Sequence, residues 1–234
     1  MVSIEEVLMG IAVLPDIARA DAGTILVSRW IVGDLARQRA AVDATMAEYA
    51  KLGAVPDGLL ALSCFVSPDS DSVLNYAQWT SDAVHARFVE SDRPRLAKGV
   101  DDLVPGIRRP GLVRYRLYRE YRPVKARVGT VVMVSVEFDR PGLARGWVDA
   151  VLEAIREAAP VPGLISNYFH VSLDDVRVLN YAEWTDDQAH RAAIDSAGGP
   201  IGEHGTVGRL FRTMPGVVDI GFDRYQLYRS LSGS

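Results

Sequence analysis

Hydrophobic and polar positions run through the same order of elements twice along this chain. Each half begins with a run rich in β-branched residues, at 23–31 and at 129–138, which favours a strand. A helix is expected next. In the first half Asp34 can cap a helix that ends near Leu52, before Gly53. In the second half the apolar residues fall at helical spacing and form one stripe: Trp147, Val148, Val151, Leu152 and Ile155.

Two further strands, a second helix and a last strand complete each half. The second helix is predicted to be capped by Ser81 or Thr80 in the first half and by Asp186 or Thr185 in the second. The strands are expected at 59–67, 73–79 and 112–119, and again at 164–172, 178–184 and 222–229. The order β-α-β-β-α-β is that of the ferredoxin-like fold.

Such a module leaves one face of its sheet bare, and two copies can bury their bare faces against each other. The predicted fold is therefore α+β, with two ferredoxin-like modules forming a dimeric α+β barrel within one chain. We expect the two modules to be related by a pseudo-twofold axis.

A repeated heptapeptide shows that the halves are copies of one module. Val73–Trp79 reads VLNYAQW, and Val178–Trp184 reads VLNYAEW at an offset of 105 residues. The offset becomes 110 near the end of each copy, so the second copy has a five-residue insertion, within 198–205. The predicted division is an N-terminal extension at 1–22, a first module at 23–120, a linker at 121–128 and a second module at 129–234.

Composition narrows the classes of function. Hydrophobic residues make up 48% of the chain, and the net charge of −4 argues against nucleic acid as a partner. A single cysteine, Cys64, excludes an internal disulfide and fits a reducing cytoplasm; we expect it to pack in the core. No apolar stretch has transmembrane length, and an N-terminus with Glu5 and Glu6 is unlike a signal peptide, so a cytoplasmic protein without a membrane partner is expected.

The chain lacks the sequence patterns of metal and nucleotide enzymes. It has no phosphate-binding loop, no cysteine and histidine set with zinc spacing, and no nucleophile elbow. The basic run Arg114, Arg116, Arg119 and Arg122 is expected to be a solvated strand edge.

The strongest chemical signal is an asparagine and a tryptophan on one strand, in each copy. Side chains alternate along a strand, so Asn75, Ala77 and Trp79 share one face, as do their counterparts Asn180, Ala182 and Trp184. An amide, an indole N–H and a flat apolar wall could hold a planar aromatic ligand. The alternative is that the tryptophan fills the core and the asparagine only satisfies backbone groups.

The repeated Asn-Tyr-Ala-(Gln/Glu)-Trp-Thr, the following helix with its histidine and the element order resemble the antibiotic biosynthesis monooxygenase family over residues 23–230. The resemblance implies an oxygenase that oxidises a polycyclic phenol, anthrone or hydroquinone of aromatic polyketide biosynthesis with O2. The product would be a quinone or, as for the similar two-module oxygenases of the jadomycin and gilvocarcin type, an angucycline whose B ring is opened by C–C cleavage. It further implies metal independence and no tightly bound cofactor, with reduced flavin (FADH2 or FMNH2) as a diffusible reductant where one is needed.

The second copy carries more polar groups than the first beside its asparagine. Asn167, Tyr168 and His170 precede Asn180 on the neighbouring strand, where the first copy has Leu62, Ser63 and Phe65. The second module is therefore predicted to be the catalytic one, with a histidine as proton acceptor because its pKa usually lies near neutral. The predicted catalytic residues are Asn180, Trp184, His170 and His190. The predicted substrate-binding residues are Asn75, Trp79, Tyr168, Asn167 and His85.

Some assignments stay open at this point. For the basic residue of quinone-forming members, Arg93 and Arg209 are the candidates. A homodimer and a flavin reductase are open as partners beside the polycyclic substrate. Two other classes compete with the oxygenase: a non-catalytic barrel that binds an aromatic compound, and a polyketide cyclase on the same scaffold.

Overall fold

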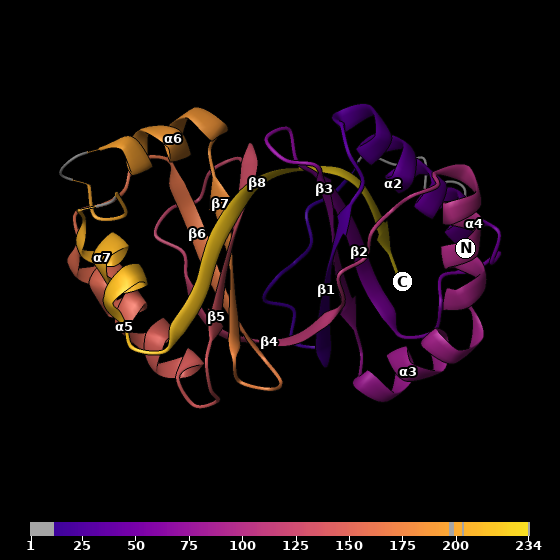
Figure 1. Ribbon diagram of the computed structural model, residues 1–234, viewed down its shortest axis with the longest axis horizontal. Helices are drawn as coiled ribbons and strands as arrows, with labels where there is room; N and C mark the ends of the chain where they lie inside the picture. The colour runs from indigo at the N-terminus through magenta and orange to yellow at the C-terminus, as the bar shows by residue number, and fades with distance from the viewer. Residues whose placement is uncertain (1–11, 197–198, 203, 234) are drawn as a thin grey trace. The chain divides into compact units, whose positions relative to one another are not determined.

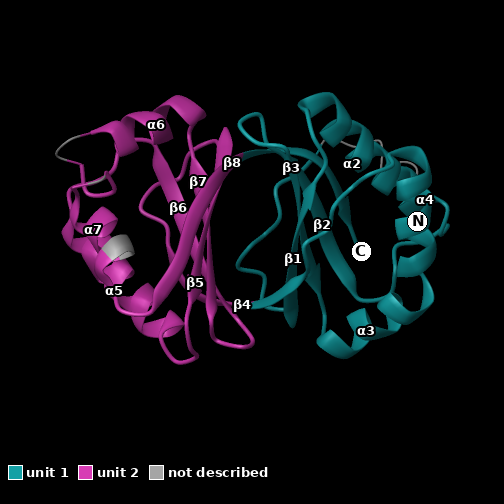
Figure 2. Cartoon of the chain, viewed as in Figure 1, with its two compact units in different colours: residues 1–115, 225–234 teal, residues 116–224 magenta. Residues whose placement is uncertain are grey.

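A computed structural model of the chain describes residues 12–196, 199–202 and 204–233 (Figure 1). These residues divide into two compact units (Figure 2). Unit 1 holds the described residues up to Tyr115 together with the segment from Tyr225 onward, and unit 2 holds Arg116–Arg224. Each unit contains antiparallel strands with helices on one face (Figure 1).

Unit 1 follows the predicted order, with β3 hydrogen-bonded between β1 and β2. Its first helix begins where expected, since the Asp34 side chain accepts a hydrogen bond from the Arg37 amide; Ser81 caps the helix after β3 by accepting from Val84. The elements are β1 Thr24–Ile31, α2 Leu35–Ala50, β2 Leu59–Val66, β3 Ser72–Trp79, α3 Asp82–Ser91, α4 Arg93–Leu103 and β4 Val113–Tyr121.

Unit 2 repeats this order, with β7 between β5 and β6. Asp186 caps α6 by accepting from the Ala189 amide, and the five residues of the predicted apolar stripe on α5 are all buried. The elements are β5 Thr130–Phe138, α5 Ala144–Glu157, β6 Leu164–Ser172, β7 Arg177–Trp184, α6 Asp187–Asp195, α7 Thr206–Thr213 and β8 Val217–Ser232.

Strands β4 and β8 each pass from one unit to the other, because the unit boundaries fall at Tyr115/Arg116 and Arg224/Tyr225. The first residues of β4 pair with β1, and the last part of β8 pairs with β2, from Val66↔Gln226 to Ala61↔Ser232. Within the units, the hydrogen-bonded strand orders are β4-β1-β3-β2-β8 and β5-β7-β6. This confirms the predicted α+β fold of two ferredoxin-like modules.

Two predictions about elements were wrong in detail. The second helix of each copy is a pair, α3 with α4 and α6 with α7, because Pro94 starts a new helix in the first copy and a glycine-rich stretch separates the pair in the second. The last strand begins at Val217, five residues before the predicted start, directly after Gly216 with its φ of +85°. Part of the predicted extension at 1–22, and Gly198 and Glu203 of the insertion, lie outside the described residues.

The repeated Arg-Tyr-(Arg/Gln)-Leu-Tyr-Arg segments attach the exchanged strand ends to helices. In unit 2 the Tyr118 hydroxyl donates to Asp149 of α5 at 2.8 Å, and Arg119 Nε donates to the same carboxylate at 3.1 Å. The equivalent contacts of unit 1 join Tyr228, at 2.9 Å, and Arg229, at 3.2 Å, to Asp43 of α2. The second half of the repeat motif therefore holds strands in place.

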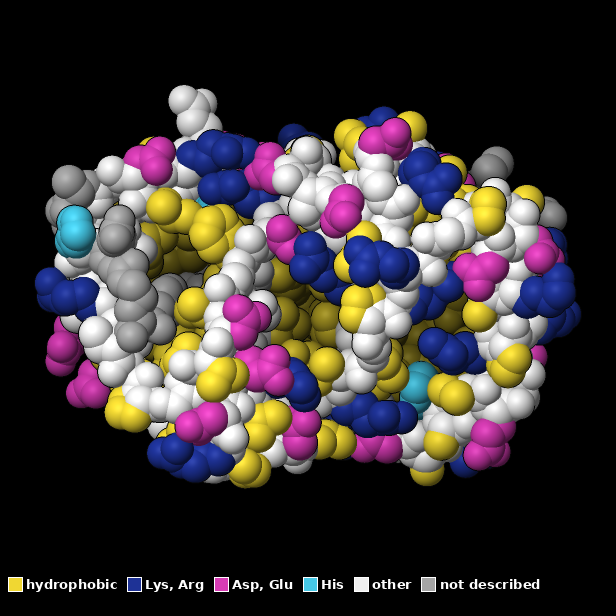
Figure 3. Space-filling view, in the orientation of Figure 1, with side chains coloured by type: hydrophobic (Ala, Val, Ile, Leu, Met, Phe, Trp, Pro, Cys, Tyr) yellow, Lys and Arg dark blue, Asp and Glu magenta, His cyan; other side chains and the backbone are white. Residues whose placement is uncertain are grey.

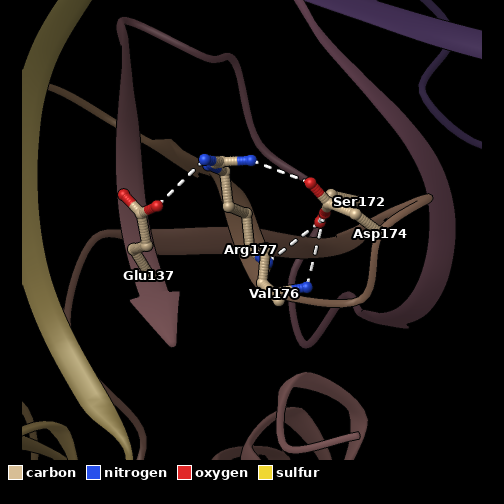
Figure 4. Close-up of polar contacts among 5 residues, drawn as sticks. All are labelled: Glu137, Ser172, Asp174, Val176 and Arg177. Carbon is tan, nitrogen blue, oxygen red and sulfur yellow. Dashed lines mark hydrogen bonds and ion pairs between the residues drawn. The ribbon is translucent and has the colours of Figure 1, made fainter. Parts of the chain in front are cut away.

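A polar network fixes the turn between β6 and β7 (Figure 4). Arg177 donates to Glu137 on β5 and to Asp174 in the turn, both at 2.9 Å. The Ser172 hydroxyl donates to Asp174 and accepts from the Arg177 amide. These bonds join the start of β7 to β5 and β6, and so help to set the register that pairs Asn180 with Phe169.

Candidate functional site

Each unit has a cavity lined by the asparagine, alanine and tryptophan of its repeated strand, which confirms that these side chains share one face. In unit 2 the cavity has a volume of about 400 Å³ and is lined by Asn180, Ala182 and Trp184. In unit 1 the cavity of about 120 Å³ is lined by Asn75, Ala77 and Trp79. Figure 3 shows hydrophobic side chains within hollows of the surface.

The unit 2 cavity has mostly apolar walls. None of the described residues that line it is an aspartate, glutamate, lysine or arginine. Its apolar side chains come from the sheet, from α5 and α6, and from the segment around α7: Val132, Val134, Val151, Ile155, Leu164, Ile194, Ile201, Val207, Ile220 and Phe222. Such walls suit a flat hydrophobic ligand.

Three polar atoms at this cavity lack a partner. Asn180 Nδ2 donates to Asn167 Oδ1 at 2.9 Å, so the two amides form a pair across β6 and β7. Asn167 Nδ2, Asn180 Oδ1 and Trp184 Nε1 are buried and have no hydrogen-bond partner among the described residues. An unsatisfied buried polar group typically costs about 1–3 kcal/mol. The cavity therefore offers two donors and one acceptor to a ligand.

His190 joins the same cavity from α6. Its ring meets the Trp184 ring edge-on, with 4.9 Å between centroids, and its Nδ1 accepts a hydrogen bond of 2.9 Å from Nε of the buried Arg224. Burial, and then the positive charge of Arg224, lower the pKa of His190 to about 4. Because Nδ1 accepts from Arg224, the proton of the neutral ring is on Nε2. The predicted base with a pKa near neutral is thus corrected: in this site His190 is a hydrogen-bond donor.

His170 and Tyr168 do not line this cavity, although the sequence placed them with Asn180. Asn167 lines it, and alternation along β6 turns Tyr168 and His170 to the opposite face of the sheet. His170 is fully buried there with Nδ1 3.2 Å from the Leu179 carbonyl oxygen, and Tyr168 meets the ring of Tyr181. Adjacency in sequence therefore gave the wrong grouping for these two residues.

The first copy builds a different arrangement around the same motif. Leu62 lines the cavity at the position of Asn167, and the Cys64 thiol, 3.2 Å from Asn75 Oδ1, is the donor to that amide. Cys64 is fully buried, as predicted, and burial raises its pKa to about 12. Phe88 of α3 occupies space beside the Trp79 ring, with 5.0 Å between centroids.

His85 in unit 1 has the same neighbours as His190, at longer range. Its ring lies edge-on to Trp79, and its Nδ1 is 3.5 Å from Nη2 of Arg114. Burial, with the nearby Arg114 as a second cause, lowers the pKa of His85 to about 4. Arg114 also lies 3.5 Å from Asp82 and is about 40% exposed in its side chain.

Arg114 and Arg224 are functional candidates that the sequence reasoning missed. The sequence predicts a solvated strand edge for Arg114 and no role for Arg224, yet each side chain lies beside the histidine of its own module. The signal was present, since they open the two Arg-Tyr-(Arg/Gln)-Leu-Tyr-Arg segments at matching positions. Of the two arginines predicted as candidates for the basic residue, Arg93 lines the unit 1 cavity, whereas Arg209 is exposed and donates to the His204 carbonyl oxygen.

The sequence matches no protein-family model and no curated protein. Solved structures share the fold. An anthrone oxidase-like protein is 19% identical with a TM-score of 0.69, over 89% of this chain and 93% of that one. Candidate monooxygenases from Fusobacterium nucleatum (8% identity, TM-score 0.56, 90% of this chain and 95% of that one) and Lactobacillus acidophilus (10%, 0.51, 90% and 96%) are also similar. At these identities the likeness establishes the fold.

No helix among the described residues is long and apolar enough to span a membrane. No group of three or more His, Cys, Asp or Glu side chains in the described ranges is placed to hold a metal ion.

Proposed function

We propose that the unit 2 cavity binds a polycyclic phenol, anthrone or hydroquinone of the aromatic polyketide class and oxidises it with O2. The observation that carries this proposal is the set of unpartnered polar atoms of Asn167, Asn180 and Trp184 at an apolar cavity of about 400 Å³. Ligand pockets are typically about 300–1,000 Å³, with a few placed polar groups on apolar walls. The fold shared with an anthrone oxidase-like protein agrees with this choice.

Substrate binding follows from the shape and polarity of the walls. A flat ring system would pack against Trp184 and the aliphatic side chains of the sheet. Its oxygen substituents would take the free amide and indole N–H groups of Asn167 and Trp184, and a phenolic O–H would donate to Asn180 Oδ1. Each polar atom that lacks a protein partner then gains one.

The chain's contribution to the reaction is electrostatic. A phenol or anthrone reacts with O2 once it has become electron-rich through loss of a proton, so the anion must be stabilised. Asn167, Trp184 and the Nε2–H of His190 are neutral donors, and Arg224 behind His190 holds a positive charge within one hydrogen bond. Apolar walls exclude water and strengthen these interactions.

Formation of a quinone from an anthrone requires no reactant besides O2. The anthrone carbon takes one oxygen atom of O2, and its two hydrogens leave with the second oxygen atom as water. Oxidative opening of a ring requires two further electrons; a reduced flavin as a diffusible reductant would supply them, and a flavin reductase would be its partner. The metal-independent oxygenase with no tightly bound cofactor is part of this proposal.

Oxygen uptake by the purified protein tests the proposal. Wild-type protein should consume about one O2 per quinone formed from an anthrone or hydroquinone, assayed with and without reduced flavin. Asn167→Leu, which copies Leu62 of the first module, should reduce the rate about 100-fold or more because a donor to the anion is lost. Leu62→Asn is the matched control and should leave the rate nearly unchanged.

One result would contradict the oxygenase. If no polycyclic phenol, anthrone or hydroquinone supports oxygen uptake under either condition while such compounds still bind, the cavity is a binding site without oxidative chemistry.

A further inference from the structure

Positively charged side chains line the unit 1 cavity, whereas the described residues that line the unit 2 cavity include none. Arg93 and Arg109 both line the unit 1 cavity. At the matching positions of the second copy, Asp219 replaces Arg109 and Val136 replaces Trp30. The cationic character of this cavity is therefore specific to the first module and is unrelated to the shared asparagine and tryptophan.

Arg109 is held in one orientation, with the donors on Nε and Nη2 unused. Its guanidinium lies over the Trp30 ring, 4.5 Å from the centroid, and Nη1 donates to Asp101 at 2.8 Å. The side chain is 19% exposed, while Nε and Nη2 are buried and have no hydrogen-bond partner among the described residues. Nε–H and Nη2–H form the edge of the guanidinium that grips both oxygens of a carboxylate.

Further features of the cavity match an anionic ligand with an apolar body. Asn75 Nδ2 is buried without a partner in the part of the chain that the structure describes, and the exposed Arg93 adds a second cation. The remaining wall is apolar and includes Leu26, Leu62, Ala77, Trp79, Phe88 and Leu96. A volume of about 120 Å³, less than a third of that in unit 2, favours one ring over a polycycle.

We propose that the unit 1 cavity is a binding site for a single-ring aromatic carboxylate. The carboxylate binds Nε–H and Nη2–H of Arg109, and the ring packs on the apolar wall near Trp79 and Phe88. Stacking on Trp30 and the ion pair with Asp101 orient the guanidinium before the ligand arrives, which reduces the entropy lost on binding. This inference does not rest on the oxygenase proposal, because it concerns the other unit and no turnover.

Titration calorimetry of the full chain with benzoate tests the site, with benzamide as a neutral probe of the same shape. We expect one benzoate to bind per chain. The affinity for benzamide should be at least about tenfold lower, because a charged, bidentate contact is replaced by a weaker one. Arg109→Met should weaken benzoate binding about tenfold. Arg109→Lys should weaken it as well, since lysine keeps the charge and loses the planar pair of donors.

Control variants locate the binding and guard against misfolding. Asn180→Ala and Trp184→Phe change only the unit 2 cavity and should leave the benzoate affinity unchanged. Thermal unfolding with and without benzoate identifies an Arg109 variant that does not fold; in that case the comparison of benzoate with benzamide on the wild-type protein still decides.

Several results would overturn the proposal. These are equal affinities for benzoate and benzamide, loss of binding in the unit 2 variants, or no binding of benzoate to folded protein. Displacement of benzoate by an equal concentration of inorganic phosphate would show that the ring contributes nothing. Failure of oxygen uptake with benzoate binding intact would contradict the oxygenase alone.

Discussion

The two cavities show how one repeated motif supports two different sites. Both copies place asparagine, alanine and tryptophan on one face of a strand and set a histidine edge-on to the tryptophan. The residues around the motif then diverge. In unit 2 Asn167 pairs with Asn180, and the described residues that line the larger cavity include no charged side chain; in unit 1 Cys64 contacts Asn75, and two arginines line the smaller cavity. The motif supplies a platform, and the neighbouring positions decide what it can bind.

The pair of histidine and arginine is closer and more deeply buried in unit 2 than in unit 1. Arg224 is buried and donates to His190 at 2.9 Å. Arg114 is partly exposed and lies 3.5 Å from both His85 and the carboxylate of Asp82. A buried charge acts through less solvent and is screened less. We therefore expect the stronger electrostatic site in the second unit, and four measurements test this difference between the units.

The largest difference should come from the asparagine and tryptophan themselves. Trp184→Phe should lower the rate of anthrone or hydroquinone oxidation about 100- to 1,000-fold, because it removes one donor to the developing anion. Asn180→Ala should have a comparable effect because it removes the acceptor of the phenolic O–H and the hydrogen bond that orients the Asn167 amide. Asn75→Ala and Trp79→Phe are the matched variants of unit 1 and should change the rate less than about threefold. Equal losses in both units, measured on folded protein, would mean two working sites and end the asymmetry.

His170 should make the two copies differ in acid stability. Burial lowers its pKa to about 4, below the ordinary value near 6.5. The unfolded state therefore binds a proton between pH 6.5 and 4 that the folded state does not, so stability is full above pH 6.5 and falls on acidification by on the order of 3 kcal/mol. His170→Phe introduces the residue that the first copy has at the matching position, Phe65. It should remove most of the loss of stability that His170 causes on acidification.

Urea denaturation at pH 7 and pH 4 measures this effect. His85 and His190 act in the same direction, so some acid sensitivity should remain in the His170→Phe variant. An unchanged difference in stability between the two pH values would show that His170 is not neutral in the folded protein. A large fall in turnover of the folded variant at pH 7 would return His170 to the site.

Arg224→Leu should lower turnover about tenfold, because the charge behind His190 is lost. It should also raise the pKa of His190 from about 4 toward its ordinary value, since Arg224 lowers that pKa, although burial would still act. NMR titration of the histidine and the pH profile of kcat measure the two effects. Arg114→Leu is the control in unit 1 and should leave kcat nearly unchanged. If Arg224→Leu left both the pKa and kcat unaltered, the pair would be purely structural.

The smallest effect is expected at the strand attachments, where the two units should agree. Asp149→Ala removes the acceptor of Tyr118 and Arg119, and Asp43→Ala removes that of Tyr228 and Arg229. Each change should lower the free energy of unfolding by about 0.5–1 kcal/mol, since these groups are exposed. Urea denaturation measures it, and a much larger loss in one unit would show that the exchanged strands are not held equivalently.

The fold class could be predicted from the sequence because its signals are local and appear twice. Alternation placed Asn180 and Trp184 on one face, helical spacing marked the buried stripe of α5, and the capping residues Asp34 and Ser81 marked helix starts. Each of these depends on residues within a few positions of one another. Duplication then supported the pairing of two modules.

Contacts between groups far apart in the chain could be found only in the folded structure. Arg224 reaches His190 from a strand 34 residues later, and the exchange of β4 and β8 between the units has no local signal in either repeat. Proximity in sequence also misled: Tyr168 and His170 flank Phe169, yet the two-residue period of a strand sends them to the face opposite Asn167. Cavity volume and the burial that lowers the pKa of His190 arise only when strands and helices pack, so no short segment could specify them.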